Sequence, residues 1–213
     1  MVPVLIDSVE RPLSDLPMAQ SLAMTLLVRT QTMGLLPPET PEHVDLDWDF
    51  LRAVAGVLEE NGLAAAPSSL LRRFEPASMD DTQVADVLRA MIDALNASPH
   101  PAGEWLPVRE MLGDDLVVRL LKISSSSIKR YSSGERDTPD ETAWRLHIIA
   151  RILGSLVGSY NEYGVRRWFG RPRRALEGAS PAEVIIAARS EDDDHLRKAI
   201  LLADELLGGA GAT

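Results

Sequence analysis

The chain contains no cysteine among its 213 residues. This absence excludes disulfide scaffolds, zinc–thiolate sites, iron–sulfur clusters and cysteine nucleophiles together. A chain without cysteine suits a reducing compartment, so we expect a cytoplasmic protein.

Long apolar runs are also missing. The most apolar segment, Leu146 to Gly158, is interrupted by His147 and Arg151 and falls short of the roughly 18 apolar residues that a membrane span needs. The amino-terminal stretch carries Asp7 and Glu10 and lacks the cationic start of a secretory signal. We therefore expect no export by that route and no membrane partner.

Residue patterns that would indicate catalysis are equally scarce. The four histidines, His43, His100, His147 and His195, lie far apart, and none has a partner at metal-ligand spacing. Phosphate-binding loops, nucleophile elbows and Rossmann glycine patterns do not occur, and the acidic run 191–194 lacks the alternation of a calcium loop. We interpret each histidine as a surface or packing residue and expect no enzyme, no metal site and no cofactor.

The composition itself is that of a folded protein, with 45% hydrophobic and 25% charged residues. The length allows one large domain or two small ones. The net charge of −10 is unevenly distributed, because residues 119–174 contain twelve basic and five acidic side chains, a balance of +7. The rest of the chain then carries −17. This asymmetry indicates a basic functional module between acidic regions, the alternative being scattered solvated arginines.

Periodicity and turn residues predict an all-α protein, and no segment alternates convincingly as a strand. In the amino-terminal region, helices are expected from Ser14 to Gly34 and from Asp47 to Asn61. A third helix opens at Ser78 with Asp81 as its capping-box partner and ends at Asn96. The turn-rich stretch 97–103 is expected to separate two domains.

The carboxy-terminal half carries stronger start signals. Thr138 with Glu141, and Ser180 with Glu183, each predict a capping box with proline at the first helical position. The first of these opens a long amphipathic helix, and a last helix is expected over 194–207.

Residues 115–136 favour a helix-turn-helix, because two short helices joined by a tight turn, the second polar and basic, present side chains to a major groove. In this interpretation Ser125, Ser126 and Lys129 face base edges. The residues expected to contact phosphates or set orientation are Ser124, Arg130, Tyr131, Ser133 and Arg136. The alternative is a buried helical hairpin whose basic residues only solvate it.

The run from Trp168 to Pro181 is the most distinctive in the chain. An aromatic pair followed by glycine, proline, leucine and glycine predicts a compact knot of short helices, in which Trp168 and Phe169 are packing residues. The exposed arginines of the run remain free to bind a partner.

The segment from about 110 to 187 resembles the Xre/MbcA/ParS-type antitoxins, which combine a degenerate helix-turn-helix with a small toxin-binding domain. The residues that carry the resemblance are Leu121-Lys122-Ile123-Ser124, Ser127-Ile128-Lys129-Arg130, Ser133-Gly134-Glu135-Arg136, Arg145-Leu146, Ala150-Arg151-Ile152-Leu153, Trp168-Phe169, Pro172, Ala175-Leu176, Gly178 and Ser180-Pro181.

The resemblance implies an antitoxin of a type II toxin–antitoxin pair. Such a protein neutralises a RES-type, NAD-consuming toxin by covering its active-site entrance, binds its own operator DNA and assembles as a homo-oligomer or a larger complex. Toxin contacts would involve Arg171, Arg173, Arg174 and the helix after Ser180. The structural core of the toxin-binding domain would comprise Trp168, Phe169, Pro172, Leu176, Gly178 and Pro181.

We therefore expect three regions. Residues 1–104 form an amino-terminal helical region without counterpart in the short antitoxins, residues 105–160 a helix-turn-helix-like region for DNA binding and dimerisation, and residues 161–213 a toxin-binding-like domain with an acidic last helix. The competing hypothesis is a stand-alone helix-turn-helix transcription regulator whose amino-terminal helices sense a ligand or a protein.

Overall fold

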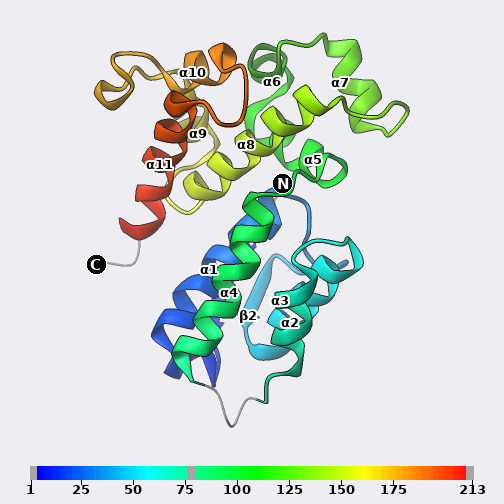
Figure 1. Cartoon of the computed structure of the whole chain (residues 1–213), viewed down its shortest axis with the longest axis vertical. Coiled ribbons are helices and arrows are strands. Elements are labelled where there is room, and N and C mark those ends of the chain that lie inside the picture. The colour runs from blue at the N-terminus through cyan, green and yellow to red at the C-terminus, as the bar shows by residue number, and fades with distance from the viewer. Residues whose placement is uncertain (1–3, 76–79, 210–213) are drawn as a thin grey trace. The chain divides into compact units, whose positions relative to one another are not determined.

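The computed structural model describes residues 4–75 and 80–209. The protein is all-α with one small sheet, and the chain forms two compact units (Figure 1). An amino-terminal unit comprises residues 2–31 and 35–98, and a carboxy-terminal unit comprises residues 32–34 and 99–213. None of the helices in the described ranges is long and apolar enough to cross a membrane.

The amino-terminal unit packs its helices around leucine, valine and methionine side chains. The helices α2 and α3 pack against each other, and α3 packs against α4. Buried side chains such as Leu51, Val54, Leu88 and Met91 form the core between them. In chain order the elements are β1 (Leu5–Val9), the 3-10 turn η1 (Leu13–Asp15), α1 (Pro17–Thr32), β2 (His43–Leu46), α2 (Trp48–Glu60), α3 (Ala65–Arg73) and α4 (Asp81–Asn96).

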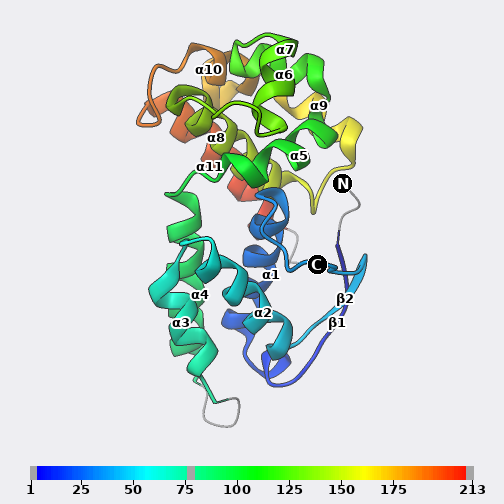
Figure 2. The same cartoon turned by 90° about the vertical axis from the view of Figure 1, so that its right-hand side faces the viewer.

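The expectation that no strand would form was wrong for β1 and β2, which pair in parallel (Figure 2). The strand β2 does alternate in burial, but it is only four residues long, too short to stand out in a sequence. The register shifts between Ile6 and Ser8, which breaks the alternation of β1.

The start of α1 differs from the expected cap. Ser14 lies in η1, and the helix begins at Pro17. The amides of Met18 and Ala19 donate instead to the carboxylate of Asp81, at 3.1 and 2.8 Å. Asp80 caps α4 by accepting from the amide of Thr82, so the expected capping role of Asp81 in its own helix was wrong. The other expected cap of α4, Ser78, lies outside the described residues.

The carboxy-terminal unit is organised around α8, which packs against α5, α6 and α11 (Figure 1). Apolar side chains of α8, among them Ile149, Ile152 and Leu156, are fully buried. The elements of this unit are α5 (Pro101–Leu112), α6 (Asp114–Leu121), α7 (Ser125–Ser132), α8 (Asp140–Leu156), α9 (Glu162–Gly170), the 3-10 turn η3 (Arg174–Leu176), α10 (Pro181–Ala187) and α11 (Asp194–Gly209).

The boundary between the two units falls between Ser98 and Pro99, and α5 runs across residue 104. Residues 105–160 and 161–213 lie together in the carboxy-terminal unit. They share one unit because α8 packs along α11, and α9 packs against α5.

Of the two expected capping boxes in this unit, one forms. At α10 the Ser180 hydroxyl accepts from the amide of Glu183, and the carboxylate of Glu183 accepts from the amide of Ser180 at 2.7 Å. The bond from the Ser180 amide, and a further one that the Ser180 hydroxyl donates to the same carboxylate at 2.8 Å, hold the pKa of Glu183 below its ordinary value.

The box expected at Thr138 was wrong, because α8 has no side-chain cap there. The Thr138 hydroxyl accepts from the indole N–H of Trp105, and Glu141 pairs with Arg145. A distant residue, Trp105, therefore occupies the Thr138 hydroxyl, and Arg145 of the same helix occupies the Glu141 carboxylate.

Candidate nucleic-acid interface and partner surface

The helices α6 and α7 form a pair joined by the short turn 122–124. Lys122 ends α6 in the left-handed conformation, at φ 57° and ψ 38°. Ser124 caps α7, since its hydroxyl oxygen accepts from the amide of Ser127 at 3.1 Å. Val117 and Ile128 are fully buried. The serine at the turn thus sets the start of α7.

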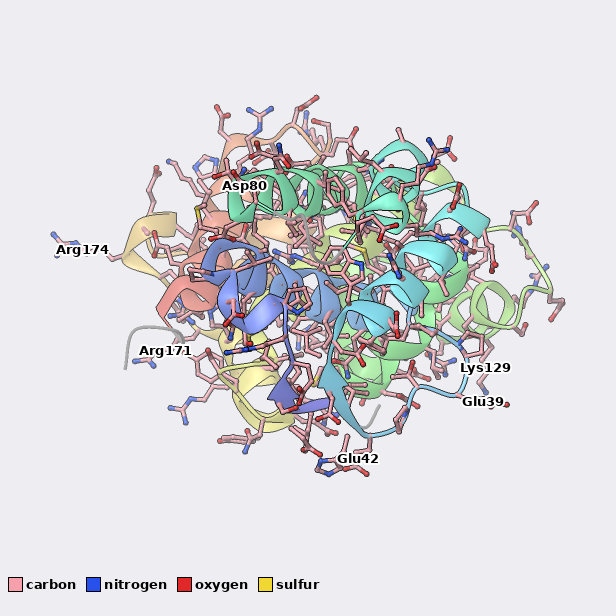
Figure 3. The ribbon with its side chains drawn as sticks, turned by 90° about the horizontal axis from the view of Figure 1, so that it is seen from below. Glu39, Glu42, Asp80, Lys129, Arg171 and Arg174 are labelled. Atoms are coloured by element: carbon pink, nitrogen blue, oxygen red, sulfur yellow. The ribbon has the colours of Figure 1, made fainter. Side chains whose placement is uncertain are left out.

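The polar side of α7 is exposed. Ser125, Ser126, Lys129 and Arg130 are all exposed, and Lys129 projects from the surface in Figure 3. Arg130 forms an ion pair with Glu135 at 3.4 Å, and both side chains are at least half exposed. Such a pair is worth little and leaves the guanidinium available to a phosphate.

The remaining residues predicted to contact DNA lie at the end of α7. Ser133 and Arg136 are exposed there. Tyr131 is half-buried, with its ring stacked near Trp105 at a centroid distance of 6.2 Å and the Arg136 guanidinium 5.9 Å from its centre. The tyrosine thus joins α7 to α5 and presents Arg136.

A second contact fixes this pair of helices to α5. Arg109 donates two hydrogen bonds to the carboxylate of Asp114, at 2.8 and 3.0 Å, and a third to the hydroxyl of Ser132. Accepting from this guanidinium holds the pKa of Asp114 below its ordinary value. Sequence reasoning missed Arg109 and Trp105, because their partners in α7 and at Thr138 are more than twenty residues away.

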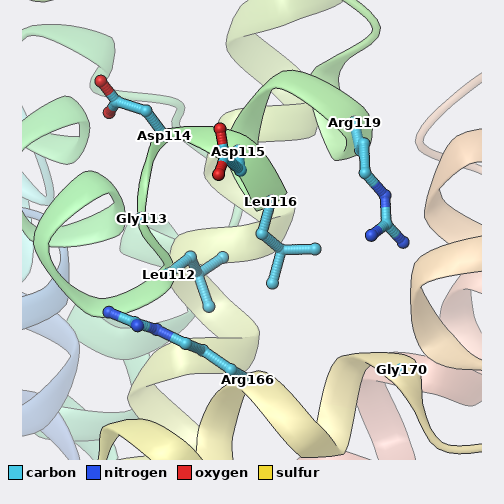
Figure 4. A pocket seen from close by; sticks show the side chains of 8 residues that line it. All are labelled: Leu112, Gly113, Asp114, Asp115, Leu116, Arg119, Arg166 and Gly170. Carbon is cyan, nitrogen blue, oxygen red and sulfur yellow. The ribbon is translucent and has the colours of Figure 1, made fainter.

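A surface cavity of about 490 Å³ opens between α6 and α9. Figure 4 shows the side chains of Leu112, Leu116 and Arg119 directed toward it, while the guanidinium of Arg166 turns toward α5. There Arg166 donates from Nε to the carbonyl of Met111 at 2.9 Å. Leu112 and Leu116 give the cavity apolar surface, Arg119 gives it a cation, and Gly113, Asp114, Asp115 and Gly170 complete its wall.

The run from Trp168 to Pro181 folds into a small aromatic knot. Trp168 and Phe169 are buried and meet edge to face, with ring centroids 5.4 Å apart. Leu176 and Pro181 are buried as well.

Pro172 and Gly178 are exposed, so their assignment to the core was wrong. Both lie in the connection between α9 and α10, where the chain turns at the surface. Gly178 adopts φ 91°, a conformation that favours glycine. The backbone conformation therefore accounts for a glycine at this position, although the residue is not buried.

The three arginines expected to contact a toxin differ in their surroundings. Arg171 and Arg174 are exposed and extend from the protein in Figure 3. Arg173 is half-buried, with its guanidinium 5.2 Å from the centre of the Trp168 ring. Arg173 therefore covers the aromatic knot, and the other two are free to meet a partner.

Arg145 of α8 lies in the interior of the carboxy-terminal unit. Its side chain is 3% exposed and donates to the carbonyls of Ile185 and Ala188 at 2.6 and 2.7 Å. Lys122 donates to the neighbouring carbonyl of Ile186 at 3.4 Å. Two cations thus stabilise the carboxy-terminal end of α10, where the helix dipole is negative.

The histidines occupy separate places. His147 is buried beside Glu104, with Nδ1 2.6 Å from the carboxylate, while His43 and His195 are exposed next to Asp7 and Glu177. Among the described residues no group of three or more histidine, aspartate and glutamate side chains is arranged to hold a metal ion.

No family model matches the chain, and neither a curated protein nor a solved structure shows significant similarity to it.

Proposed function

We propose that this protein is the antitoxin of a type II toxin–antitoxin pair that neutralises a RES-type, NAD-consuming toxin and binds operator DNA through α6 and α7. The observation that carries the proposal is the helical pair itself. Ser124 caps α7, and the side chain of Ile128 is buried beneath the helix. The opposite side of the helix exposes serine, lysine and arginine side chains. This is the arrangement that a helix-turn-helix needs to enter a major groove.

In the proposed complex with DNA, α7 lies in the major groove. Ser125, Ser126 and Lys129 reach base edges, and the small serines allow the helix start to approach the duplex closely. Arg130, Ser133 and Arg136 contact phosphates and set the register. Ser124 acts through the helix start that it caps.

Toxin binding is assigned to the surface around the aromatic knot. Arg171 and Arg174 supply exposed positive charge there, while Arg173 packs on Trp168 and keeps the segment in place. In this proposal the antitoxin acts by covering the toxin's active-site entrance, without catalysis of its own. Assembly as a homo-oligomer in the cytoplasm belongs to the same proposal.

The experiment that tests the antitoxin assignment is a pull-down of the full-length protein from its own cells, followed by identification of the retained chains. We expect a RES-type protein, and co-expression of the pair should restore growth that the toxin alone arrests. An Arg171→Ala/Arg174→Ala variant should weaken the complex, whereas Arg72→Ala/Arg89→Ala, which removes two exposed cations of α3 and α4, should not. Failure of both capture and growth rescue would overturn the assignment.

DNA binding has its own test. Replacing Lys129 and Arg130 by alanine should weaken DNA binding and lower the slope of log affinity against log salt by about one unit for each phosphate contact that is lost. The Arg72→Ala/Arg89→Ala variant is the control, because it also removes two positive charges but lies outside α7, and its slope should equal that of the parent protein. An unchanged slope in the Lys129/Arg130 variant would count against α7 as the DNA-binding helix.

The second candidate is a stand-alone transcription regulator. It is favoured by the amino-terminal unit, a compact part of the chain outside the segment that resembles antitoxins. Retention of DNA without a RES-type protein in the pull-down would support this alternative.

A further inference from the structure

The sheet of the amino-terminal unit is an incomplete one. It consists of two parallel strands, and in the described part of the chain the outer edge of β1 pairs with nothing. Parallel sheets are normally larger and covered, and exposed strand edges are normally protected. An edge of this kind is a template for one more strand.

The backbone of β1 shows which groups are free. Leu5 donates its amide to the carbonyl of Glu42 at 2.7 Å, so the peptide groups of Leu5 face β2. Successive residues of a strand point their peptide groups in opposite directions, and therefore the amide and carbonyl of Ile6 face outward. They therefore lie on the side of β1 away from β2, which is the one strand that pairs with β1 in the described part of the chain.

The side chains around this edge are strongly acidic. Asp7, Glu10, Glu42 and Asp45 lie on or beside the two strands and are all exposed. Among the described residues, His43 is the one basic side chain that contacts these carboxylates, with its Nδ1 2.7 Å from a carboxylate oxygen of Asp7. Figure 3 shows Glu42 extending from the surface of this region.

Two of these carboxylates share a single hydrogen-bond donor, the hydroxyl of Ser8. The Ser8 hydroxyl lies 2.8 Å from a carboxylate oxygen of Glu10 and 2.6 Å from one of Asp45. A hydroxyl has a single proton, so it satisfies only one of the two carboxylates at a time. Both Glu10 and Asp45 can accept from a further cationic donor.

We propose that the outer edge of β1 binds an extended, basic segment of a partner protein, which adds to the sheet as a third strand. Its backbone would pair with the free amide and carbonyl of Ile6, and its lysine or arginine side chains would lie against Glu10 and Asp45. Leu5, which is 45% exposed, offers an apolar contact at the start of the strand. This proposal does not depend on the antitoxin assignment.

The charges argue for a foreign segment over a second copy of this chain. Antiparallel pairing of β1 with its own copy, centred on Asp7, would place two carboxylates directly opposite each other. Like charges at opposed positions destabilise a strand pair. A basic strand relieves the same repulsion.

The test uses the full-length protein and a fluorescein-labelled seven-residue peptide in which lysine and valine alternate. Fluorescence anisotropy should show saturable binding, and hydrogen exchange should show the amide of Ile6 slowed by about tenfold in the complex. A peptide of the same composition with alternating L and D residues keeps the charge but cannot form a regular strand. A glutamate–valine peptide reverses the charge. Both control peptides should bind more weakly than the all-L lysine–valine peptide.

Protein variants separate strand addition from general attraction between opposite charges. Glu10→Gln/Asp45→Asn should weaken the binding of the lysine–valine peptide by about fivefold to tenfold, the scale of two partly exposed ion pairs. The matched control, Asp86→Asn/Asp93→Asn on α4, should leave the affinity unchanged. Equal binding of the L,D peptide, an unprotected Ile6 amide, or equal losses of affinity in the two variants would each overturn the proposal.

Discussion

Individual side chains near Trp168 show how few residues hold the aromatic knot together. The indole meets the Phe169 ring edge to face, and the guanidinium of Arg173 lies over the indole ring at 5.2 Å from its centre. A large aromatic in such a position contributes through area and through ring geometry. We therefore assign Trp168 to stability and the exposed Arg171 and Arg174 to recognition.

Replacing Trp168 by alanine should lower the free energy of unfolding by about 3–5 kcal/mol, because the cavity cannot be refilled by the short elements around it. Urea denaturation followed by circular dichroism measures this decrease. Trp168→Phe, which keeps an aromatic ring, should have a smaller effect. An alanine variant as stable as the parent protein, but unable to bind its partner, would reverse the assignment.

Arg145 is the second residue with a large expected effect. Truncation to alanine would leave the carbonyls of Ile185 and Ala188 without their charged donor, and we expect the free energy of unfolding to fall by about 3 kcal/mol. Arg145→Lys keeps the charge but cannot reach both carbonyls in the same way, so its effect should be smaller. Arg189→Ala, at an exposed position one residue after Ala188, is the control and should change stability little. Equal stabilities of the two alanine variants would refute the structural role of Arg145.

At the scale of elements, helix starts separate into those capped locally and those capped by a distant residue. Ser124 and Ser180 cap their own helices, and Ser180 lies at the position where the sequence pattern predicts a start. The start of α1 instead depends on Asp81, a residue of α4. Asp81 therefore caps α1 and at the same time links α1 to α4.

The cap of α1 can be tested with a single substitution. Asp81→Ala should cost about 1 kcal/mol and speed hydrogen exchange at the amides of Met18 and Ala19. Asp93→Ala, at an exposed position of the same helix, should leave both amides unaffected. Unchanged exchange at Met18 in the Asp81 variant would contradict the assignment.

The contact between α5 and the start of α6 predicts a dependence on pH. The pKa of Asp114 is lowered by Arg109 from an ordinary value of 3.8 in the unfolded chain. The contribution of this carboxylate to stability is therefore fully present above about pH 4 and disappears as the pH falls through the lowered pKa. Unfolding measured between about pH 6 and 2 should show this decrease, and Asp114→Asn should remove that part of the pH dependence. A variant with the same acid profile as the parent would disprove it.

At the scale of the whole molecule, charge is divided between the two parts of the chain. Residues 1–98 contain fifteen acidic and six basic side chains, whereas residues 99–213 contain seventeen and sixteen. The acidic excess therefore lies mainly in the amino-terminal part, where the free edge of β1 is found. DNA and a basic partner strand would then be drawn to different regions of the chain.

The carboxy-terminal unit also depends on a close backbone approach between distant parts of the chain. A Cβ atom on Gly103 would lie 2.3 Å from the carbonyl oxygen of Met33, too close for any real contact. Gly103→Ala should therefore destabilise the protein by about 2–4 kcal/mol in chemical denaturation, since backbone has to shift. Gly56→Ala in α2 meets open space and should stabilise by about 0.5–1 kcal/mol. A Gly103→Ala variant of unchanged stability would show that the approach is not required.

Much of this architecture follows from local pattern. The helix spans of α2, α4 and α8 lie where apolar periodicity predicts them, and Ser124 and Ser180 act as caps, because these features involve residues within one or two turns of each other. The exposed side of α7, with Lys129 and Arg130, was also predictable from the sequence, since a short amphipathic helix has only one apolar stripe.

Contacts between distant residues were decided by the tertiary structure alone. The pairing of β1 with β2 and the capping of α1 by Asp81 join residues more than thirty positions apart. The burial of Arg145 became possible only when the end of α10 placed two carbonyls beside it. Local patterns determine what each segment can form, but desolvation and hydrogen bonding at a distance determine which polar side chains are buried in the interior and which remain for a partner.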